Sequence, residues 1–278
     1  MSNWETILFW ITLVIYSLVC GGFIYSIVFK NPRALPKLSA LLRVGFLLHS
    51  ATIAARFAAT GHLPWSGDYE YALMGGWFII GATVLIGWRN AALQPLAAAT
   101  VPLVVVMMGY GVMRNPSLTP MAASLKTGWL YIHVYFAWLA FCSYTLAMAA
   151  GVLYLLKRKN QQAGGGNPVY DKFPSLERLD ELMFRYVVFG FITDSIMLVA
   201  GSIWAEGLWG SYWNWDPVET WSLISYLVYG IAIHLRVTMG WRDARQAWLV
   251  IIALSTVLIS FFGVTFVVNS SLHVFQVR

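Results

Sequence analysis

The sequence is poor in charged residues. Only 11% of its 278 residues are Asp, Glu, Lys or Arg, whereas 59% are hydrophobic and the mean hydropathy is +0.67. Soluble globular domains carry about 25% charged residues, so this composition excludes an ordinary soluble protein. The few charges cluster between long apolar runs, which indicates that lipid rather than water surrounds most of the chain.

Cysteine and an N-terminal basic cluster are also lacking. The two cysteines, Cys20 and Cys142, each lie inside an apolar run and form no Cys-x-x-Cys pair, so the sequence suggests neither a disulfide framework nor a thiol-redox motif. The segment Met1–Glu5 has none of the basic residues that begin a cleavable signal peptide. We therefore expect the first apolar run to be a membrane span.

Long apolar runs are what the sequence does contain. A bilayer core of ~30 Å needs about 20 apolar residues as α-helix, and a backbone inside lipid must satisfy its own hydrogen bonds. We predict an all-α, polytopic integral membrane protein of about eight transmembrane helices, forming a single membrane domain over 1–278. The predicted spans are 7–29, 40–59, 72–88, 92–113, 128–156, 187–207, 218–240 and 247–268.

The basic residues predict the orientation of these spans. Of the 18 lysines and arginines, all fall in loops or helix ends on one side except Arg56, Arg114, Lys126 and Arg278. By the positive-inside rule that side is cytoplasmic, so both termini are predicted to be external. The net charge of +6 then reflects topology, and we expect membrane lipid rather than nucleic acid as a contact.

The longest predicted cytoplasmic segment, 157–186, has two parts. A flexible linker contains Gly164–Gly166. An amphipathic run from Pro174 to Leu182 follows it, which we interpret as a helix lying at the membrane interface.

A predicted external loop, 204–221, is rich in tryptophan. Its core reads Trp209-Gly-Ser-Tyr-Trp-Asn-Trp-Asp-Pro-Val-Glu-Thr-Trp221. Asp216 followed by a proline and Glu219 predicts a helix start with a capping box. Capping does not explain the density of tryptophan. Large, flat, rigid rings outside the membrane suit stacking against a planar ligand.

Four of the five histidines fall into two pairs. His133 and His273 are predicted to be external, on the side of the tryptophan-rich loop. His49 and His234 lie within spans, each about 10–14 Å from the cytoplasmic edge. A single histidine is more often a hydrogen-bonded structural residue, but polar groups at such depth are costly and usually functional. Each pair could supply both axial ligands of a haem iron, whereas zinc would lack its third and fourth ligands.

These features together resemble the CcsA/ResC type of System II cytochrome c biogenesis proteins, which carry a tryptophan-rich WWD segment. The resemblance is carried by Trp209–Glu219 and the helix that follows it to His234. Three further segments agree with the family, namely Leu48–Glu70, Trp129–Tyr144 and Gly201–Ala205. The resemblance extends over roughly residues 40–273.

The resemblance implies that the chain handles haem b as a transported substrate. His133 and His273 would be the external axial ligands, and His49 and His234 the ligands of an intramembrane site. The platform between the external ligands would consist of Trp209, Trp213, Trp215 and Asp216.

Two charged residues within the spans remain to be assigned. Arg56 lies seven residues after His49, on the same helical face and ~10 Å further out, so it is a candidate partner for a haem propionate. The alternative is an interfacial arginine that reaches towards water. Asp194 could accept a hydrogen bond from a ligand imidazole or pair with Arg236.

The resemblance also implies partners. The chain would act with a CcsB/ResB-type subunit that has a large external domain, as the membrane component of a holocytochrome c synthase (haem lyase) acting on apocytochrome c. The location would be the bacterial cytoplasmic membrane, with the thylakoid membrane as the alternative.

Thioether formation adds the thiols of a CxxCH segment to the haem vinyl groups, and this chain has no CxxCH. Two other classes stay open, a b-type haem electron carrier and a haem-free membrane transporter.

Overall fold

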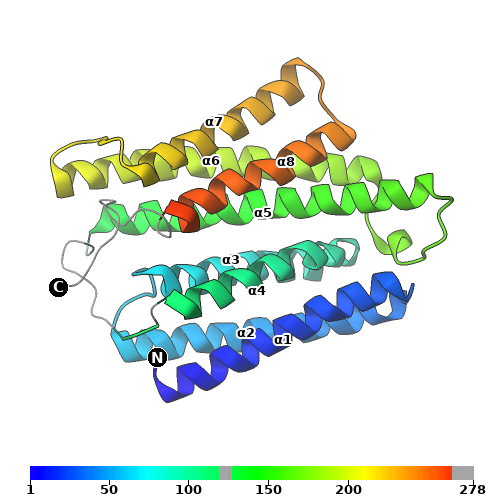
Figure 1. Cartoon of the computed structure of the whole chain (residues 1–278), viewed down its shortest axis with the longest axis horizontal. Helices are drawn as coiled ribbons and strands as arrows, with labels where there is room; N and C mark the ends of the chain where they lie inside the picture. The colour runs from blue at the N-terminus through cyan, green and yellow to red at the C-terminus, as the bar shows by residue number, and fades with distance from the viewer. Residues whose placement is uncertain (115, 119–124, 126, 265–278) are drawn as a thin grey trace. The chain divides into compact units, whose positions relative to one another are not determined.

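The computed structural model describes residues 1–114, 116–118, 125 and 127–264, and the regular structure in these ranges is helical (Figure 1). The long helices are α1 Asn3–Val28, α2 Leu35–Thr60, α3 Asp68–Arg89, α4 Ala97–Arg114, α5 Gly128–Gln162, α6 Leu176–Trp209, α7 Pro217–Thr238 and α8 Asp243–Leu258. Shorter segments are η1 Pro32–Ala34, η2 Ala91–Leu96, η4 Tyr170–Lys172 and the π-helical η5 Ile259–Gly263. Within the described ranges, eight helical segments are long and apolar enough to cross a membrane. The predicted all-α membrane fold is confirmed.

The chain divides into two compact units. The first unit comprises Met1–Leu118 and Ala149–Glu181, and the second comprises Thr119–Met148 and Leu182–Arg278. In the first unit α1 packs along α2 and α3 packs along α4, and in the second α7 packs along α8 (Figure 1). Long helices α5 and α6 each contribute to both units.

The predicted amphipathic helix is continuous with the membrane span that follows it, and its place at the membrane interface stays a prediction. The amphipathic run in 157–186 is not a separate element, because it forms the first turns of the 34-residue helix α6. No proline interrupts the chain between Leu176 and Trp209, so the helix continues into the membrane span. Leu179 and Met183 on these first turns are fully buried, as the amphipathic pattern requires.

The connection between α5 and α6 is anchored to the first unit by side chains. Lys157 Nζ donates to the carbonyl oxygens of Phe173 and Pro174, both at 2.9 Å. Asn167 Nδ2 donates to Ile27 O at 2.8 Å, near the end of α1. These bonds hold the connection against the end of α5 and the end of α1.

The contact between α1 and α2 depends on a glycine. A Cβ at Gly45 would lie 2.7 Å from Tyr16 Cε1 and 2.9 Å from Ile15 Cγ2. Tyr16 is fully buried and its hydroxyl is hydrogen-bonded to His49, so its ring has little freedom to move away. Small residues at such positions let membrane helices approach closely, and packing then drives their association.

We predict that Gly45→Ala lowers the free energy of unfolding by about 1–3 kcal/mol, the usual cost of overpacking a close contact. The matched control is Gly21→Ala in α1, because a Cβ there meets nothing within 4 Å. That change should be neutral or stabilise the helix by about 0.5–1 kcal/mol. Thermal unfolding of the purified protein in detergent measures both, and equal melting temperatures for the two variants would contradict the packing argument.

Candidate functional site

His133 is held by a backbone hydrogen bond from its neighbouring helix. The residue lies in the second turn of α5, half-buried, and its Nδ1 is 2.9 Å from Met197 O in α6. A carbonyl oxygen only accepts, so Nδ1 carries the proton and donates it. In the neutral imidazole, Nε2 therefore carries the lone pair, which is the arrangement found in metal-binding histidines.

The face of α6 next to His133 is shaped for the imidazole ring. A Cβ at Gly201 would lie 2.6 Å from His133 Nδ1, so the ring rests directly against the helix backbone. Trp204 lies one turn further on and stacks on His133, with ring centroids 6.2 Å apart and planes at 24°. Trp209 then packs edge-on against Trp204 at 5.3 Å. A continuous series of rings thus leads from His133 to the end of α6.

Only part of this arrangement follows from the sequence pattern. Met197, Gly201 and Trp204 are spaced four and three residues apart, which places them on one helical face. That spacing could have identified this face of α6, but it does not show that His133 packs against it. Trp204 and the Met197 carbonyl are therefore contributions that the sequence did not single out.

The predicted helix start after the tryptophan-rich loop is confirmed. Asp216 is the N-cap of α7, its Oδ1 accepts from Val218 N at 2.9 Å, and Pro217 is the first helical residue. Glu219 completes the capping box. Asp216 and Glu219 are both buried, and both carboxylates cap the first turn of α7.

Glu219 also determines the conformation of Trp215. Its Oε2 accepts from Asn214 N at 2.7 Å and from Asp216 N at 3.3 Å, the amides on either side of Trp215. Trp215 takes a φ of 56°, in the left-handed region that bulky residues rarely adopt. Such strain costs on the order of 1–3 kcal/mol and persists only where the surroundings impose it. The result is an indole ring with 69% of its surface exposed.

The other tryptophans predicted to form the platform lie close by in the chain. Trp213 packs edge-on against Trp215, with centroids 5.9 Å apart and planes at 85°. Trp209 is half-buried at the C-terminal end of α6. The loop therefore presents one exposed ring supported by a second, a surface that suits a flat apolar ligand. The remaining external ligand candidate, His273, lies outside the described residues.

His49 is fully engaged within the first unit. Its side chain is 0% exposed. Nε2 lies 3.0 Å from Leu73 O and must donate to it, so Nδ1 accepts from the Tyr16 hydroxyl at 3.1 Å. These bonds join α1, α2 and α3 around one imidazole, as a structural histidine would.

His234 occupies a different setting. It is exposed, and its Nδ1 lies 3.3 Å from Thr238 Oγ1. Thr238 ends α7, so His234 is ~6 Å from that helix end, whereas His49 is ~21 Å along α2 from Leu35. These distances run to helix ends and not to the membrane edge, so the equal depth of the two residues stays a prediction. The two residues belong to different units, and their pairing as haem ligands stays a prediction.

Arg56 forms a buried ion-pair cluster. Only 1% of its surface is exposed, which contradicts the interpretation as an interfacial arginine reaching towards water. The guanidinium donates to Glu70 Oε1 at 2.8 Å, Glu5 Oε1 at 3.4 Å, Pro116 O at 3.0 Å and Ser117 O at 2.7 Å. Both carboxylates are fully buried. The cluster ties α1, α2 and α3 together, and the propionate contact remains a prediction.

Asp194 has a partner that the sequence did not predict. Tyr144 donates its hydroxyl proton to Asp194 Oδ2 at 3.0 Å, and the Tyr144 ring stacks on Tyr229 with centroids 3.5 Å apart. The carboxylate borders a cavity of about 20 Å³, about the space of one water molecule. Other polar lining groups are Ser222, Ser225 and Ser260. Asp194 thus belongs to a small polar cluster within the second unit.

Comparison with known proteins identifies relatives over most of the chain. The family model for cytochrome C assembly protein matches residues 65–273. The cytochrome c biogenesis protein CcsA of Guillardia theta is 28% identical over 240 residues, which cover 80% of this chain and 79% of the relative. CcsA of Prochlorococcus marinus (strain SARG) is 30% identical over 252 residues, which cover 79% of this chain and 78% of the relative.

A solved structure shares the fold. The cytochrome c heme lyase CcmF matches with a TM-score of 0.73 and 20% sequence identity, over 94% of this chain and 47% of that chain. The present chain therefore spans about half the length of that protein. At this identity the match shows a common helical architecture.

We predict that Arg56→Met lowers the free energy of unfolding by about 3–5 kcal/mol, because it leaves Glu5 and Glu70 as buried charges without their cation. The control is Arg114→Met, which removes the more exposed ion pair of Arg114 with Asp68 in the same unit and should cost about 1 kcal/mol or less. Thermal unfolding in detergent compares the two. A smaller loss for Arg56→Met than for Arg114→Met would contradict a structural role for the cluster.

Proposed function

The chain belongs to the cytochrome c assembly protein family, and from this premise we propose that it presents haem at an external site formed by His133 and the tryptophan-rich loop. It functions in cytochrome c biogenesis, and its curated relatives are CcsA proteins. The proposed substrate is haem b, held for covalent attachment to apocytochrome c.

One observation carries this proposal, the hydrogen bond from His133 Nδ1 to Met197 O. An axial haem ligand needs its ring orientation and tautomer fixed by a partner of the other nitrogen. The close contact with Gly201 and the stacking on Trp204 restrict the same ring further. His133 is therefore the better supported member of the proposed external pair, and His273 is proposed as its counterpart from the family resemblance.

The tryptophan-rich loop supplies a surface for the porphyrin. Glu219 holds the backbone on both sides of Trp215 and keeps its indole exposed. A rigid, outward-facing ring can stack on a flat macrocycle with little loss of conformational entropy. We propose that Trp209, Trp213 and Trp215 contact haem and that Asp216 acts indirectly, by capping α7.

In the proposed reaction, this chain contributes by positioning haem more than by transferring protons. Each thioether forms when a cysteine S–H adds across a vinyl C=C of haem, with the hydrogen and the sulfur going to the two carbons, so no atom leaves. Holding the haem with its vinyl edge accessible would supply much of the acceleration. The incoming histidine of apocytochrome c could then displace an axial imidazole. The chain would thus be the membrane component of a haem lyase.

The proposed setting includes a partner and a membrane. We propose a CcsB/ResB-type subunit with a large external domain as the partner, in the bacterial cytoplasmic membrane, with the thylakoid membrane as the alternative. Eight helices in the described ranges are long and apolar enough to cross a membrane, which agrees with either location. His49 and His234 are proposed as an inner haem site, and occupation of that site would require His49 to release Leu73 or Tyr16.

The proposal predicts that His133→Gly nearly abolishes the formation of holocytochrome c in cells that depend on this protein and its partner. Added imidazole should restore a large part of the yield, because it can fill the space of the missing ring and coordinate iron. The control is His62→Gly in the loop between α2 and α3. Covalent haem staining of a reporter cytochrome c measures the yield, and wild-type yield from His133→Gly would contradict the proposed site.

A second prediction tests the positioning of the ring without changing the ligand. Gly201→Ala would place a methyl group 2.6 Å from Nδ1 and tilt the imidazole, so we expect the holocytochrome yield to fall about 10–100-fold, as for other ligand-orienting changes. The control is Gly207→Ala in the same helix, where a Cβ meets nothing within 4 Å. Equal yields from both variants, at equal protein levels, would show that this close contact is not needed.

A further inference from the structure

A group of exposed cations lies at the predicted cytoplasmic end of the first unit. They come from η1, α2 and the end of α3, and comprise Arg33, Lys37, Arg43 and Arg89. Within the part of the chain that the structure describes, none of these four side chains forms an ion pair, and the ion pairs present involve other residues. This end of the unit is therefore electrostatically complementary to an anionic surface.

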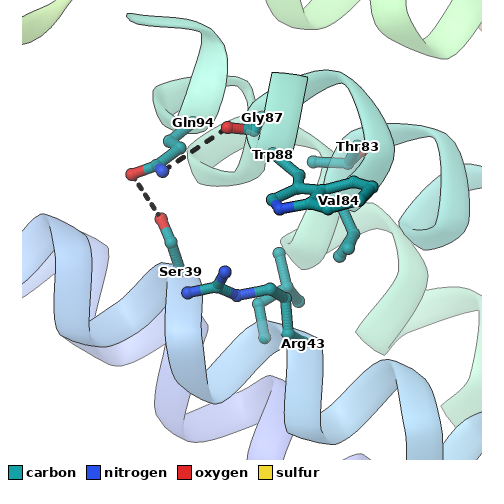
Figure 2. A pocket seen from close by; sticks show the side chains of 8 residues that line it. Ser39, Arg43, Thr83, Val84, Gly87, Trp88 and Gln94 are labelled. Carbon is teal, nitrogen blue, oxygen red and sulfur yellow. Dashed lines mark hydrogen bonds between the residues drawn. The ribbon is translucent and has the colours of Figure 1, made fainter. Parts of the chain in front are cut away.

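One of these cations borders a pocket between α2, the end of α3 and η2 (Figure 2). Ser39 Oγ donates to Gln94 Oε1 at 3.0 Å, and Gln94 Nε2 donates to Gly87 O at 3.5 Å. These bonds hold the three segments together, and all three residues line the pocket. Figure 2 shows the side chains of Arg43 and Trp88 beside the same opening. The volume of the pocket is about 20 Å³, so a headgroup would lie at its mouth and not inside it.

The position of Arg43 along α2 matters. It lies eight residues after Leu35, ~12 Å along the helix axis, and within the first turn of the predicted span 40–59. A cation at this depth is costly unless it reaches the headgroups or meets an anion. Trp88, one residue before the end of α3, has 71% of its surface exposed, as expected for an indole at the membrane interface.

An apolar surface continues from this opening into the membrane. Leu47 lies one turn beyond Arg43 on α2, and Leu85 lies about one turn before Trp88 on α3. They are 68% and 47% exposed, respectively. A soluble phosphate would use only the cation, whereas a phospholipid would use the cation and this apolar surface together. The combination favours a lipid.

We propose that the Arg43–Trp88 pocket binds the headgroup phosphate of an anionic phospholipid from the cytoplasmic leaflet. The guanidinium donates charge-assisted hydrogen bonds to the phosphate, Trp88 lies at headgroup level, and the acyl chains lie along Leu47 and Leu85. Basic pockets between membrane helices on the cytoplasmic side bind anionic headgroups in this way. The residues that line this pocket include none of those proposed to hold haem.

The test compares Arg43→Gln with Arg33→Gln. Both changes remove one positive charge from the same end of the unit, but Arg33 does not line the pocket. Native mass spectrometry and thermal unfolding of the full-length protein, titrated with phosphatidylglycerol, phosphatidylcholine or inorganic phosphate, measure binding. We expect phosphatidylglycerol to bind and stabilise the wild type preferentially. Arg43→Gln should weaken that binding about ten-fold or more, and Arg33→Gln at most about five-fold.

Three results would overturn the proposal. Equal losses from the two variants would show a diffuse attraction between basic residues and anionic lipid. Equal stabilisation by phosphatidylcholine would show that the headgroup charge is not recognised. Equal stabilisation by inorganic phosphate would show an anion site that needs no acyl chain. Wild-type circular dichroism of both variants establishes that the comparison is between folded proteins.

Discussion

The absence of water from the bilayer core is the constraint on which the rest of this structure depends. A polar side chain in a membrane helix must find its partner within the protein, or the cost is several kcal/mol. Three polar side chains in the described helices meet this demand through bonds that join different helices. His49 joins α1, α2 and α3, Arg56 binds two carboxylates from α1 and α3, and Asp194 of α6 accepts from Tyr144 of α5. Each polar group therefore also specifies which helices pack together.

The same constraint separates structural from functional residues. His49 and Arg56 are buried. Both ring nitrogens of His49 and all three guanidinium nitrogens of Arg56 form hydrogen bonds, as expected of structural residues. His133 is half-buried and its bond to Met197 O leaves Nε2 in the form that can coordinate a metal. Trp215 is exposed although its backbone is strained. Backbone strain that the surroundings impose at a residue with an exposed ring is a reason to expect a ligand there.

Features that depend on local sequence were predictable, and features that depend on packing were not. The eight spans follow from runs of apolar residues, and the cap of α7 follows from Asp216, Pro217 and Glu219, because a helix start is decided within a few residues. The partners of Arg56 could not be predicted, since Glu5 is 51 residues away along the chain and only the packing of α1 on α2 brings them together. The continuation of α6 through the predicted interfacial helix has a similar cause. An amphipathic pattern identifies a helix that is buried on one side, but it does not say where that helix ends.

The central claim is that His133 supplies an axial ligand to haem outside the membrane. The most direct measurement is the absorption spectrum and reduction potential of haem in the purified protein with its partner, for the wild type and for His133→Met. The account predicts a six-coordinate, bis-histidine spectrum in the wild type, and a changed spectrum with a higher potential in the variant, because a thioether ligand favours reduced iron. A wild-type preparation without haem, or an identical spectrum and potential in the variant, would contradict it.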